Sequence, residues 1–150
     1  MTQLRNEHIV LRALEPEDIE LIYQWENNPE VWQVSDTRMP ISKFMLANYI
    51  KTADRDIWES RELRLMIETA EGRPVGTIEL FDFEPYHSRV GLGITIVDTA
   101  DRNKGLATQA CNLIENYVTE TLGSAQIFIN IAESNQPSIG LFEKRNYLNT

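Results

Sequence analysis

The sequence predicts an α+β fold in which helices cover both faces of a central mixed β-sheet, an αβα sandwich. Two observations predict it. Three β-type segments at 63–69, 75–83 and 88–97 follow one another along the chain with turn residues between them. A helical segment then separates the last of these from a further β-type segment at 125–132. Strand–helix–strand units are right-handed and make parallel neighbours, so 90–97 and 125–132 are predicted to be parallel.

The predicted elements follow in the order β-α-α-β-β-β-α-β-α, and the first three rest on local signals. Segment 8–14 ("HIVLRAL") alternates as a strand does. A helix follows, with Pro16 at its first position and two acidic residues at the positive end of its dipole. The Asn-Pro pair at 28–29 ends it, because a residue before proline is disfavoured in the α region. A second helix is predicted over 41–52.

The clearest β signal is the hairpin that comes next. Leu63, Leu65 and Ile67 alternate with other side chains, which is typical of a strand. The sequence "AEGRP" at 70–74 has turn chemistry, and 75–83 returns as the partner strand.

The second half of the chain alternates strands with helices. Segment 88–97 is mostly apolar, which predicts a strand buried on both faces. Gly91 and Gly93 inside it predict a bulge or the close approach of another group. A helix of about four turns begins near Leu106, and a last short helix begins just before Pro137.

Composition and charge limit the classes of function. The 150 residues suit one domain over 1–150. The formal net charge of −9 disfavours nucleic acid and anionic membranes and favours cationic partners. No apolar run approaches a membrane span, and the N-terminus lacks an apolar signal region. The single cysteine, Cys111, excludes an internal disulfide and a cysteine-based metal cluster. We expect a cytoplasmic protein without a metal.

The loop within "ADRNKGLATQA" at 100–110 is the strongest candidate binding site. It joins a strand to the start of a helix, where unpaired N–H groups and the positive end of the helix dipole favour an anion. Gly105 allows close approach, and Arg102 and Lys104 add positive charge. Neither the Walker A motif nor the dinucleotide fingerprint is present. These residues alone leave open a phosphate site or a plain loop with a solvated basic pair.

The motif R-N-K-G-L-A in this loop resembles the [Q/R]-x-x-G-x-[G/A] pyrophosphate loop of the GNAT family of acetyl-CoA-dependent N-acetyltransferases. Two further stretches, "GTIELFDF…RVGLGITIV" and "NQPSIGLFEKRNY", are similar to the branch that contains spermidine acetyltransferases and ribosomal-protein N-terminal acetyltransferases. The resemblance covers nearly the whole chain. It implies a GNAT-like sheet in which the two parallel strands splay apart.

The resemblance also implies where acetyl-CoA binds. Backbone groups of Ile94, Thr95 and Ile96 would pair with pantetheine like an added strand, and Asn135 would reach the pantetheine arm. Backbone N–H groups of six consecutive residues would hold the pyrophosphate: Arg102, Asn103, Lys104, Gly105, Leu106 and Ala107.

The implied reaction is direct attack of an amine on the acetyl thioester in a ternary complex. An alkyl ammonium has a pKa near 10.4, so it must first lose a proton, and a carboxylate can accept it. Glu79 and Asp82 match positions where polyamine-acetylating members carry carboxylates, and Glu79 is the predicted base. Three residues apart on a strand, these two side chains face opposite sides unless a bulge intervenes. Together with Asp82, Glu26 and Asp36 are predicted to line the acceptor pocket.

Several acceptors and one different function remain open. The amine could be a polyamine, a protein N-terminus or another small amine. The alternative is a degenerate GNAT module that binds an acyl-CoA with little or no catalysis.

Two departures from the family matter. Phe142 stands where many members carry a tyrosine that protonates the leaving thiolate, and Tyr147 is predicted to pack in the core. The family normally continues for two more strands after a segment like "EKRNYLNT". We therefore expect an uncovered sheet edge near the last strand, which is either paired in a homodimer or leaves the C-terminus poorly ordered. Asn146 replaces the usual glycine after the last helix, and asparagine tolerates the left-handed conformation.

Overall fold

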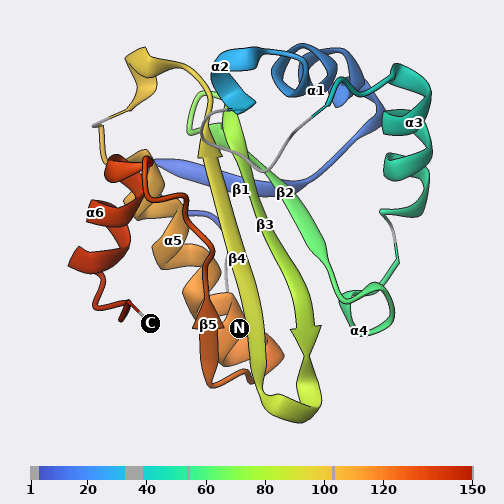
Figure 1. The fold of residues 1–150 in the computed structure, drawn as a ribbon. Coiled ribbons are helices and arrows are strands. Elements are labelled where there is room, and N and C mark those ends of the chain that lie inside the picture. The colour runs from blue at the N-terminus through green and yellow to red at the C-terminus, as the bar shows by residue number, and fades with distance from the viewer. Residues whose placement is uncertain (1–3, 33–38, 54, 103, 150) are drawn as a thin grey trace.

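A computed structural model describes residues 4–32, 39–53, 55–102 and 104–149, and Figure 1 shows its fold. The strands are β1 (Ile9–Ala13), β2 (Leu63–Thr69), β3 (Pro74–Glu84), β4 (Arg89–Ile96) and β5 (Gln126–Phe128). The α-helices are α1 (Ile19–Glu26), α2 (Pro29–Trp32), α3 (Lys43–Thr52), α4 (Ile57–Ser60), α5 (Leu106–Tyr117) and α6 (Gln136–Lys144). Short 3-10 turns lie at Pro16–Asp18, Pro85–His87 and Thr99–Asp101, and a π turn at Val118–Leu122 extends α5.

The strands of the described residues form one mixed sheet in the order β1-β2-β3-β4-β5. The first three pairings are antiparallel and β4 pairs with β5 in parallel. The predicted α+β architecture and the parallel pair are confirmed. The one-turn helix α4 was not predicted; Asp56 caps it by accepting a hydrogen bond from the Trp58 N–H at 2.8 Å.

The strand predicted at 125–132 is too long, because β5 pairs with β4 over only three residues. Its register joins Arg89–Gly91 to Gln126–Phe128. Beyond Phe128 the chain diverges from β4, so the second half of β4 has no strand beside it on that side among the described residues. This divergence is the splay that the family resemblance implied.

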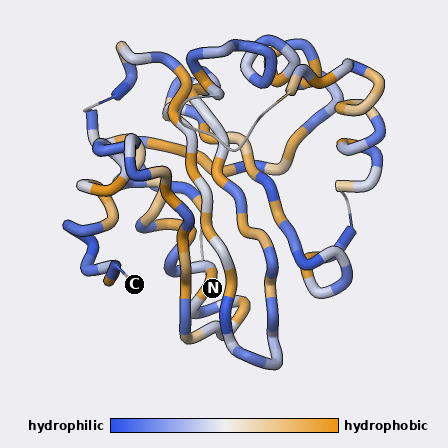
Figure 2. The backbone as a smooth tube through the Cα atoms, viewed as in Figure 1, coloured by the Kyte–Doolittle hydropathy of each residue, from blue (hydrophilic) through white to orange (hydrophobic). Residues whose placement is uncertain are grey.

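Helices cover both faces of the sheet, and each face has its own core. Side chains of Leu65 and Ile67 point to the larger core, which α5 and Phe142 of α6 complete. Met66, between them, points to a smaller core that it shares with Ile22 of α1 and Leu46 of α3. This period of two is what strand geometry requires, and Figure 2 shows hydrophobic residues recurring along the strands.

The bulge predicted at Gly91 and Gly93 lies instead on the neighbouring strand β3. The β3–β4 register shifts between Phe81 and Glu84, and Asp82 adopts a φ of 49° there. The other prediction for the two glycines, close approach of another group, holds: side chains of β3 lie against both. A Cβ on Gly91 would lie 2.4 Å from the Phe81 ring, and one on Gly93 would lie 3.1 Å from Glu79 Oε1.

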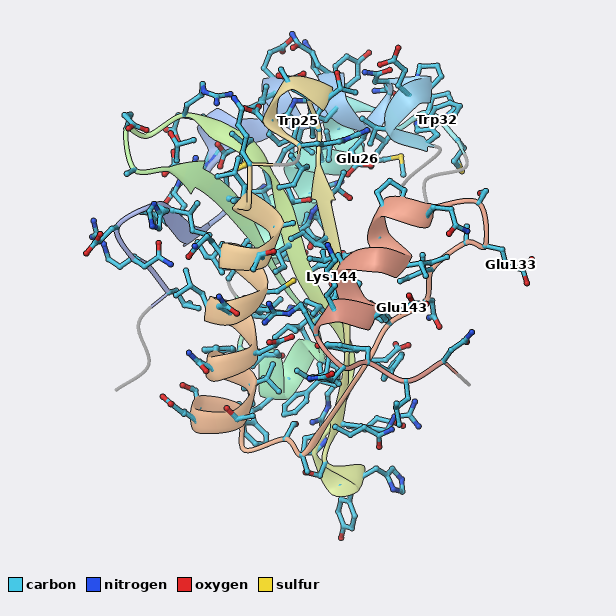
Figure 3. The ribbon with its side chains drawn as sticks, turned by 90° about the vertical axis from the view of Figure 1, so that its left-hand side faces the viewer. Trp25, Glu26, Trp32, Glu133, Glu143 and Lys144 are labelled. Carbon is cyan, nitrogen blue, oxygen red and sulfur yellow. The ribbon has the colours of Figure 1, made fainter. Side chains whose placement is uncertain are left out.

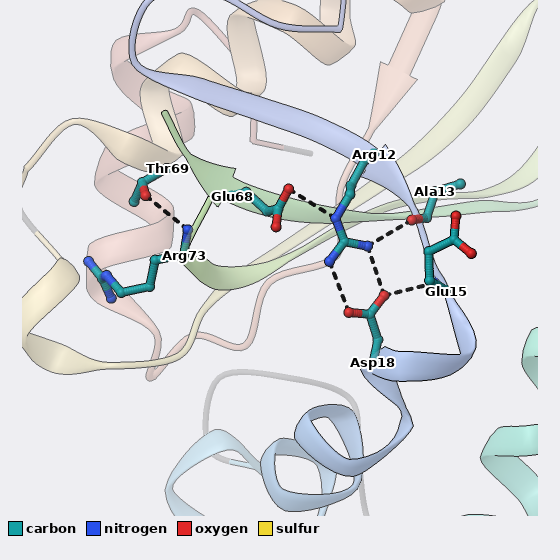
Figure 4. A network of polar contacts seen from close by, with 7 residues as sticks. All are labelled: Arg12, Ala13, Glu15, Asp18, Glu68, Thr69 and Arg73. Carbon is teal, nitrogen blue, oxygen red and sulfur yellow. Dashed lines mark hydrogen bonds and ion pairs between the residues drawn. The ribbon is translucent and has the colours of Figure 1, made fainter. Parts of the chain in front are cut away.

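A polar network joins β1 to the turn before α1 and to β2 (Figure 4). Arg12 donates two hydrogen bonds to the Asp18 carboxylate, at 2.8 and 2.9 Å, and makes an ion pair with Glu68 at 2.9 Å. Asp18 also accepts from the Glu15 N–H at 2.8 Å. Hydrogen bonding to the Arg12 guanidinium lowers the pKa of Asp18 below its ordinary value.

The lowered pKa of Asp18 predicts a pH-dependent stability. A carboxylate with a depressed folded pKa stabilises the fold above its unfolded pKa, which is about 3.9, and loses this contribution as pH falls through the folded value. We expect the free energy of unfolding to fall as pH decreases below about 4. Urea unfolding at a series of pH values measures this. In Arg12→Ala the free energy of unfolding should change less steeply with pH between pH 4 and 2. An unchanged steepness would contradict the role of Arg12 in lowering the pKa of Asp18.

Candidate active site

The predicted cofactor residues converge on one cavity, here called the α5 cleft, of about 450 Å³. It lies between the second half of β4, the start of α5 and the start of α6. Its walls contain most of the residues that the sequence predicted for acetyl-CoA: Ile94, Thr95, Ile96, Arg102, Gly105, Leu106, Ala107 and Asn135. Lys104 is exposed and is not among the lining residues, and Asn103 lies outside the described residues.

The start of α5 presents backbone donors to this cleft. Gly105 is the N-cap with a φ of 77°, and among the described residues no side chain caps the helix. The first intrahelical bond runs from the Gln109 N–H to the Gly105 carbonyl at 3.0 Å. The N–H groups of Leu106, Ala107 and Thr108 therefore precede the helical ladder, and these three residues line the cleft at the positive end of the helix dipole. Such a site favours an anion such as a pyrophosphate.

Arg102 has a different role in the loop from the one predicted. Its backbone N–H, predicted to face the pyrophosphate, donates to the Thr99 carbonyl at 3.1 Å. Its guanidinium folds back and donates to the carbonyls of Ile96 and Val97, at 3.2 and 3.3 Å. Arg102 thereby provides hydrogen-bond donors to the last carbonyl of β4 and to the carbonyl that follows it. A cation that the sequence reasoning missed, Lys144 of α6, also lines the cleft; Figure 3 labels it.

A second cavity of about 130 Å³, here called the splay cavity, lies where β4 and the chain after β5 separate. Residues 92–95 line it from β4 and residues 129–132 from the diverging segment. Asn135 borders both this cavity and the α5 cleft, and its amide oxygen caps α6 by accepting from the Ser138 N–H at 3.4 Å.

A third cavity, of about 280 Å³, is here called the carboxylate pocket and lies on the face covered by α1 and α2. Its walls contain Trp25, Glu26, Val31, Arg64, Thr77, Glu79, Gly93, Ile94, Thr95 and Val97. Figure 3 shows Trp25 and Glu26 close together at this end of the sheet.

Strand register explains why charged side chains meet in the carboxylate pocket. Arg64 of β2 pairs with Glu79 of β3, which pairs with Gly93 of β4, so all three share one face. Arg64 forms an ion pair with Glu26, and the two side chains are 18% and 16% exposed. The neighbouring carboxylates of Glu26 and Glu79 raise the pKa of the Arg64 guanidinium against the opposing effect of burial. Sequence reasoning missed Arg64; its signal was a charge in the mostly apolar first half of β2.

The three cavities meet at one stretch of β4. Ile94 and Thr95 line all three, and Glu79 lines both the splay cavity and the carboxylate pocket. The anion-favouring start of α5 and the pocket that contains carboxylates therefore have Ile94 and Thr95 of β4 as common walls. An acyl donor and a cationic acceptor could meet at Thr95.

The remaining predicted site residues lie elsewhere or beyond description. Asp82, on the bulge, is exposed and is not among the described lining residues of the three cavities. Asp36 lies outside the described residues.

The C-terminal aromatic residues form a packed pair. Phe142 is buried, lines the splay cavity and packs edge-on against Tyr147, with ring centroids 5.0 Å apart. The Tyr147 hydroxyl donates to Glu115 at 2.8 Å, and burial raises its pKa. This arrangement agrees with the predicted packing role of Tyr147. Asn146 adopts a φ of 68°, so the expected left-handed conformation is confirmed.

No cluster of three or more His, Cys, Asp or Glu side chains within the described ranges is placed to hold a metal ion. Within the same ranges, no helix has the length and apolar character needed to span a bilayer.

Comparison with known families decides the identity of this fold. The model of the acetyltransferase (GNAT) domain matches residues 8–146. The chain belongs to the GNAT acetyltransferase family. It is 27% identical over 136 residues to spermidine N(1)-acetyltransferase of Escherichia coli K12, covering 91% of this chain and 70% of that protein. It is 24% identical to the Vibrio cholerae enzyme of the same name, covering 93% and 78%.

Solved structures agree on the GNAT fold. Spermidine N-acetyltransferase from Vibrio cholerae, in complex with CoA and spermine, superposes with a TM-score of 0.85 at 23% identity, covering 97% of this chain and 83% of that one. A crystal structure described as a probable acetyltransferase superposes equally well at 24% identity, covering 100% and 84%. This GNAT protein is an acetyl-CoA-dependent N-acetyltransferase that acts on a primary amine.

Proposed function

We propose that the amine acetylated by this protein belongs to a polyamine. The observation that carries the proposal is the carboxylate pocket, in which Glu26 and Glu79 lie beside Thr95 of β4. Nearby carboxylates stabilise an alkyl ammonium, and a net charge of −9 attracts polycations. Two of the similar proteins are spermidine N(1)-acetyltransferases and one similar structure contains spermine, which supports the same class of acceptor.

We assign the α5 cleft to the cofactor. In this proposal the N–H groups of Leu106, Ala107 and Thr108 donate to the pyrophosphate, and Lys144 adds positive charge. Backbone groups of residues 94–96 pair with the pantetheine amides along the splayed side of β4. Asn135 stands where the two cavities join and contacts the pantetheine arm. When bound, acetyl-CoA supplies the acetyl thioester as electrophile.

Glu79 is the proposed general base. Its carboxylate takes the proton that the substrate ammonium must lose, directly or through a water. The neutral nitrogen then bonds to the acetyl carbon as the C–S bond breaks, and it releases one further proton to solvent to become the amide. Phe142 has no proton to give the sulfur, so solvent supplies it.

Direct attack is favoured over an acyl-cysteine route. Cys111 is the chain's single cysteine and is fully buried. Burial raises the pKa of its thiol to about 12, so at neutral pH very little is present as the nucleophilic thiolate.

The test is release of free thiol from acetyl-CoA with a panel of amines: spermidine, spermine, a diamine, a monoamine and a peptide with a free N-terminus. We expect the highest kcat/KM with the polyamines. A preference for the peptide or the monoamine would overturn the polyamine assignment. Tight coenzyme A binding without turnover of any amine would identify a binding module.

Gly93 is predicted to keep Glu79 in place. A Cβ at this position would lie 3.1 Å from Glu79 Oε1 and 3.3 Å from its Cγ, so the carboxylate would have to shift. We expect Gly93→Ala to lower kcat/KM for spermidine about tenfold, the scale on which small misplacements of reacting groups act. Glu79→Asp shortens the side chain and should lower kcat/KM on its own. In the double variant the fold-loss of kcat/KM should be smaller than the product of the two single fold-losses. Steady-state kinetics of the four proteins measures this, and strictly multiplicative losses would contradict it.

The open edge of the sheet bears on self-association. β5 forms one edge of the described sheet, and one similar spermidine N-acetyltransferase structure is dodecameric. We propose that this chain, acting as a single domain, also forms at least a homodimer, and that it works in the cytoplasm. Sedimentation of the full chain as a monomer at micromolar concentration would contradict the first point.

A further inference from the structure

A carboxylate lies in the cleft that we assign to an anion. Asp101 ends the 3-10 turn before α5, is 4% exposed and lines the α5 cleft together with Gly105 and Leu106. An uncompensated carboxylate at this place would repel a diphosphate at the helix start. Some other group must offset its charge if the cleft is to bind acetyl-CoA.

That group is Arg73, which arrives from a distant part of the sequence. Its guanidinium meets the Asp101 carboxylate in a two-pronged contact, with Nη1 to Oδ2 at 2.9 Å and Nη2 to Oδ1 at 2.7 Å. Paired hydrogen bonds of this kind fix direction as well as distance. They lower the pKa of Asp101, so the carboxylate stays ionised and the guanidinium cancels its charge.

Arg73 is itself held firmly by the hairpin that carries it. It directly precedes β3, at the end of the turn from β2. Its N–H donates to Thr69 Oγ1 at 3.2 Å, and its carbonyl accepts from the Thr69 N–H at 2.9 Å. Figure 4 shows the first of these contacts. The anchored backbone gives Arg73 a fixed base from which to reach the loop.

The loop between β4 and α5 is thus tied to the sheet at two points. Arg102 ties it to the last carbonyls of β4, and Arg73 ties Asp101 to the β2–β3 hairpin. We propose that Arg73 is a positioning residue for coenzyme A: it offsets the charge of Asp101 and holds the loop so that the α5 N–H groups receive the diphosphate. This inference rests on the proposed cofactor site.

The experiment compares ligands with and without phosphate. Titration calorimetry measures the dissociation constants of coenzyme A and of pantetheine for the wild type and Arg73→Gln. We expect Arg73→Gln to weaken the binding of coenzyme A by about tenfold or more, because the diphosphate of this ligand then meets the uncompensated charge of Asp101. Affinity for pantetheine should change less than twofold. Equal losses for both ligands, or no loss for coenzyme A, would overturn the proposal.

A rescue separates charge compensation from simple support of the loop. Asp101→Asn in the Arg73→Gln background removes the repulsion and should restore most of the coenzyme A affinity. A role that is only structural predicts no such rescue. Arg73→Lys keeps the charge but not the two-pronged geometry. Its affinity for coenzyme A should lie between those of the wild type and Arg73→Gln.

Arg12→Gln is the matched control. It removes the same kind of contact from Asp18, which is not among the described residues lining the α5 cleft. It should lower thermal stability without a selective loss of coenzyme A over pantetheine. If the wild type itself fails to bind coenzyme A, the proposed function fails; if it binds and Arg73→Gln binds equally well, only this inference fails.

Discussion

Glu79→Gln is expected to lower kcat/KM for spermidine by about 10²- to 10⁴-fold, the range in which general base catalysis contributes. The substitution keeps the size and polarity of the side chain and removes its ability to take a proton. Affinity for coenzyme A should be unchanged, because the α5 cleft does not include this side chain.

The pH profile distinguishes lost base catalysis from lost substrate binding. Without a base, the enzyme depends on amine that is already neutral, and this fraction rises about tenfold per pH unit below the ammonium pKa of roughly 10.4. The deficit of Glu79→Gln should therefore shrink as pH is raised from 7 to 9. A deficit confined to KM and independent of pH would assign Glu79 to ammonium binding alone.

Glu84→Gln is the matched control for this prediction. Glu84 is a carboxylate on the same strand, exposed, beyond the β3 bulge and paired with Arg89 at 3.3 Å. It is not among the described residues lining the three cavities, so its loss should leave kcat/KM within about twofold. Comparable losses in both variants would point to a general field effect of the acidic strand.

Gly105→Val is expected to weaken coenzyme A binding by about 100-fold, or about 2.7 kcal/mol. The glycine has a φ of 77°, which a β-branched residue resists. Apart from its chain neighbours, no described atom lies within 4 Å of a Cβ built there, so a Cβ would project into open space rather than into the core. Both effects act where the proposed pyrophosphate site lies.

Gly123→Val separates backbone strain from obstruction of the cleft. Gly123 caps the other end of the same helical segment, with a φ of 70° and equally open space around a built Cβ. Both variants should lose comparable stability, about 1–3 kcal/mol for a non-glycine residue in this region. Only Gly105→Val should lose coenzyme A affinity. Urea unfolding and titration calorimetry measure the two quantities, and unchanged affinity in Gly105→Val would refute the cofactor assignment.

The order of the strands and longer helices, and most residues of the α5 cleft, could be predicted from the sequence. Period-two alternation in 63–69 and the turn at 70–74 predict a hairpin without knowledge of the rest of the chain. The start of α5 carried a weaker local signal, because a glycine at a helix N-terminus is compatible with an anion site formed by backbone groups. The resemblance to the GNAT family, rather than the loop alone, selected the cofactor residues. Most of the predicted cofactor residues accordingly line one cavity.

The acceptor side depends on side chains that only the tertiary structure brings together. Arg64 of β2 and Glu79 of β3 share a pocket because strand register pairs them. Glu26 ends α1 and joins them through its ion pair with Arg64, because α1 packs on that face of the sheet. Asp82 is an example of a position that could not be predicted from the sequence. Its place on the strand depends on a bulge that the sequence reasoning assigned to Gly91 and Gly93 on β4 and that the structure has on β3.

By itself, then, the sequence determined the mixed sheet, its longer helices and the glycine at the start of α5, because each follows from short-range periodicity and backbone chemistry. The tertiary structure alone decided where β5 leaves β4, that Arg102 closes the strand end and that Arg73 meets Asp101. The β4–β5 pairing and the Arg73–Asp101 contact join residues far apart in the chain, and packing across the sheet sets them. The Arg102 contact spans only five and six residues, but it depends on how the loop turns back after β4.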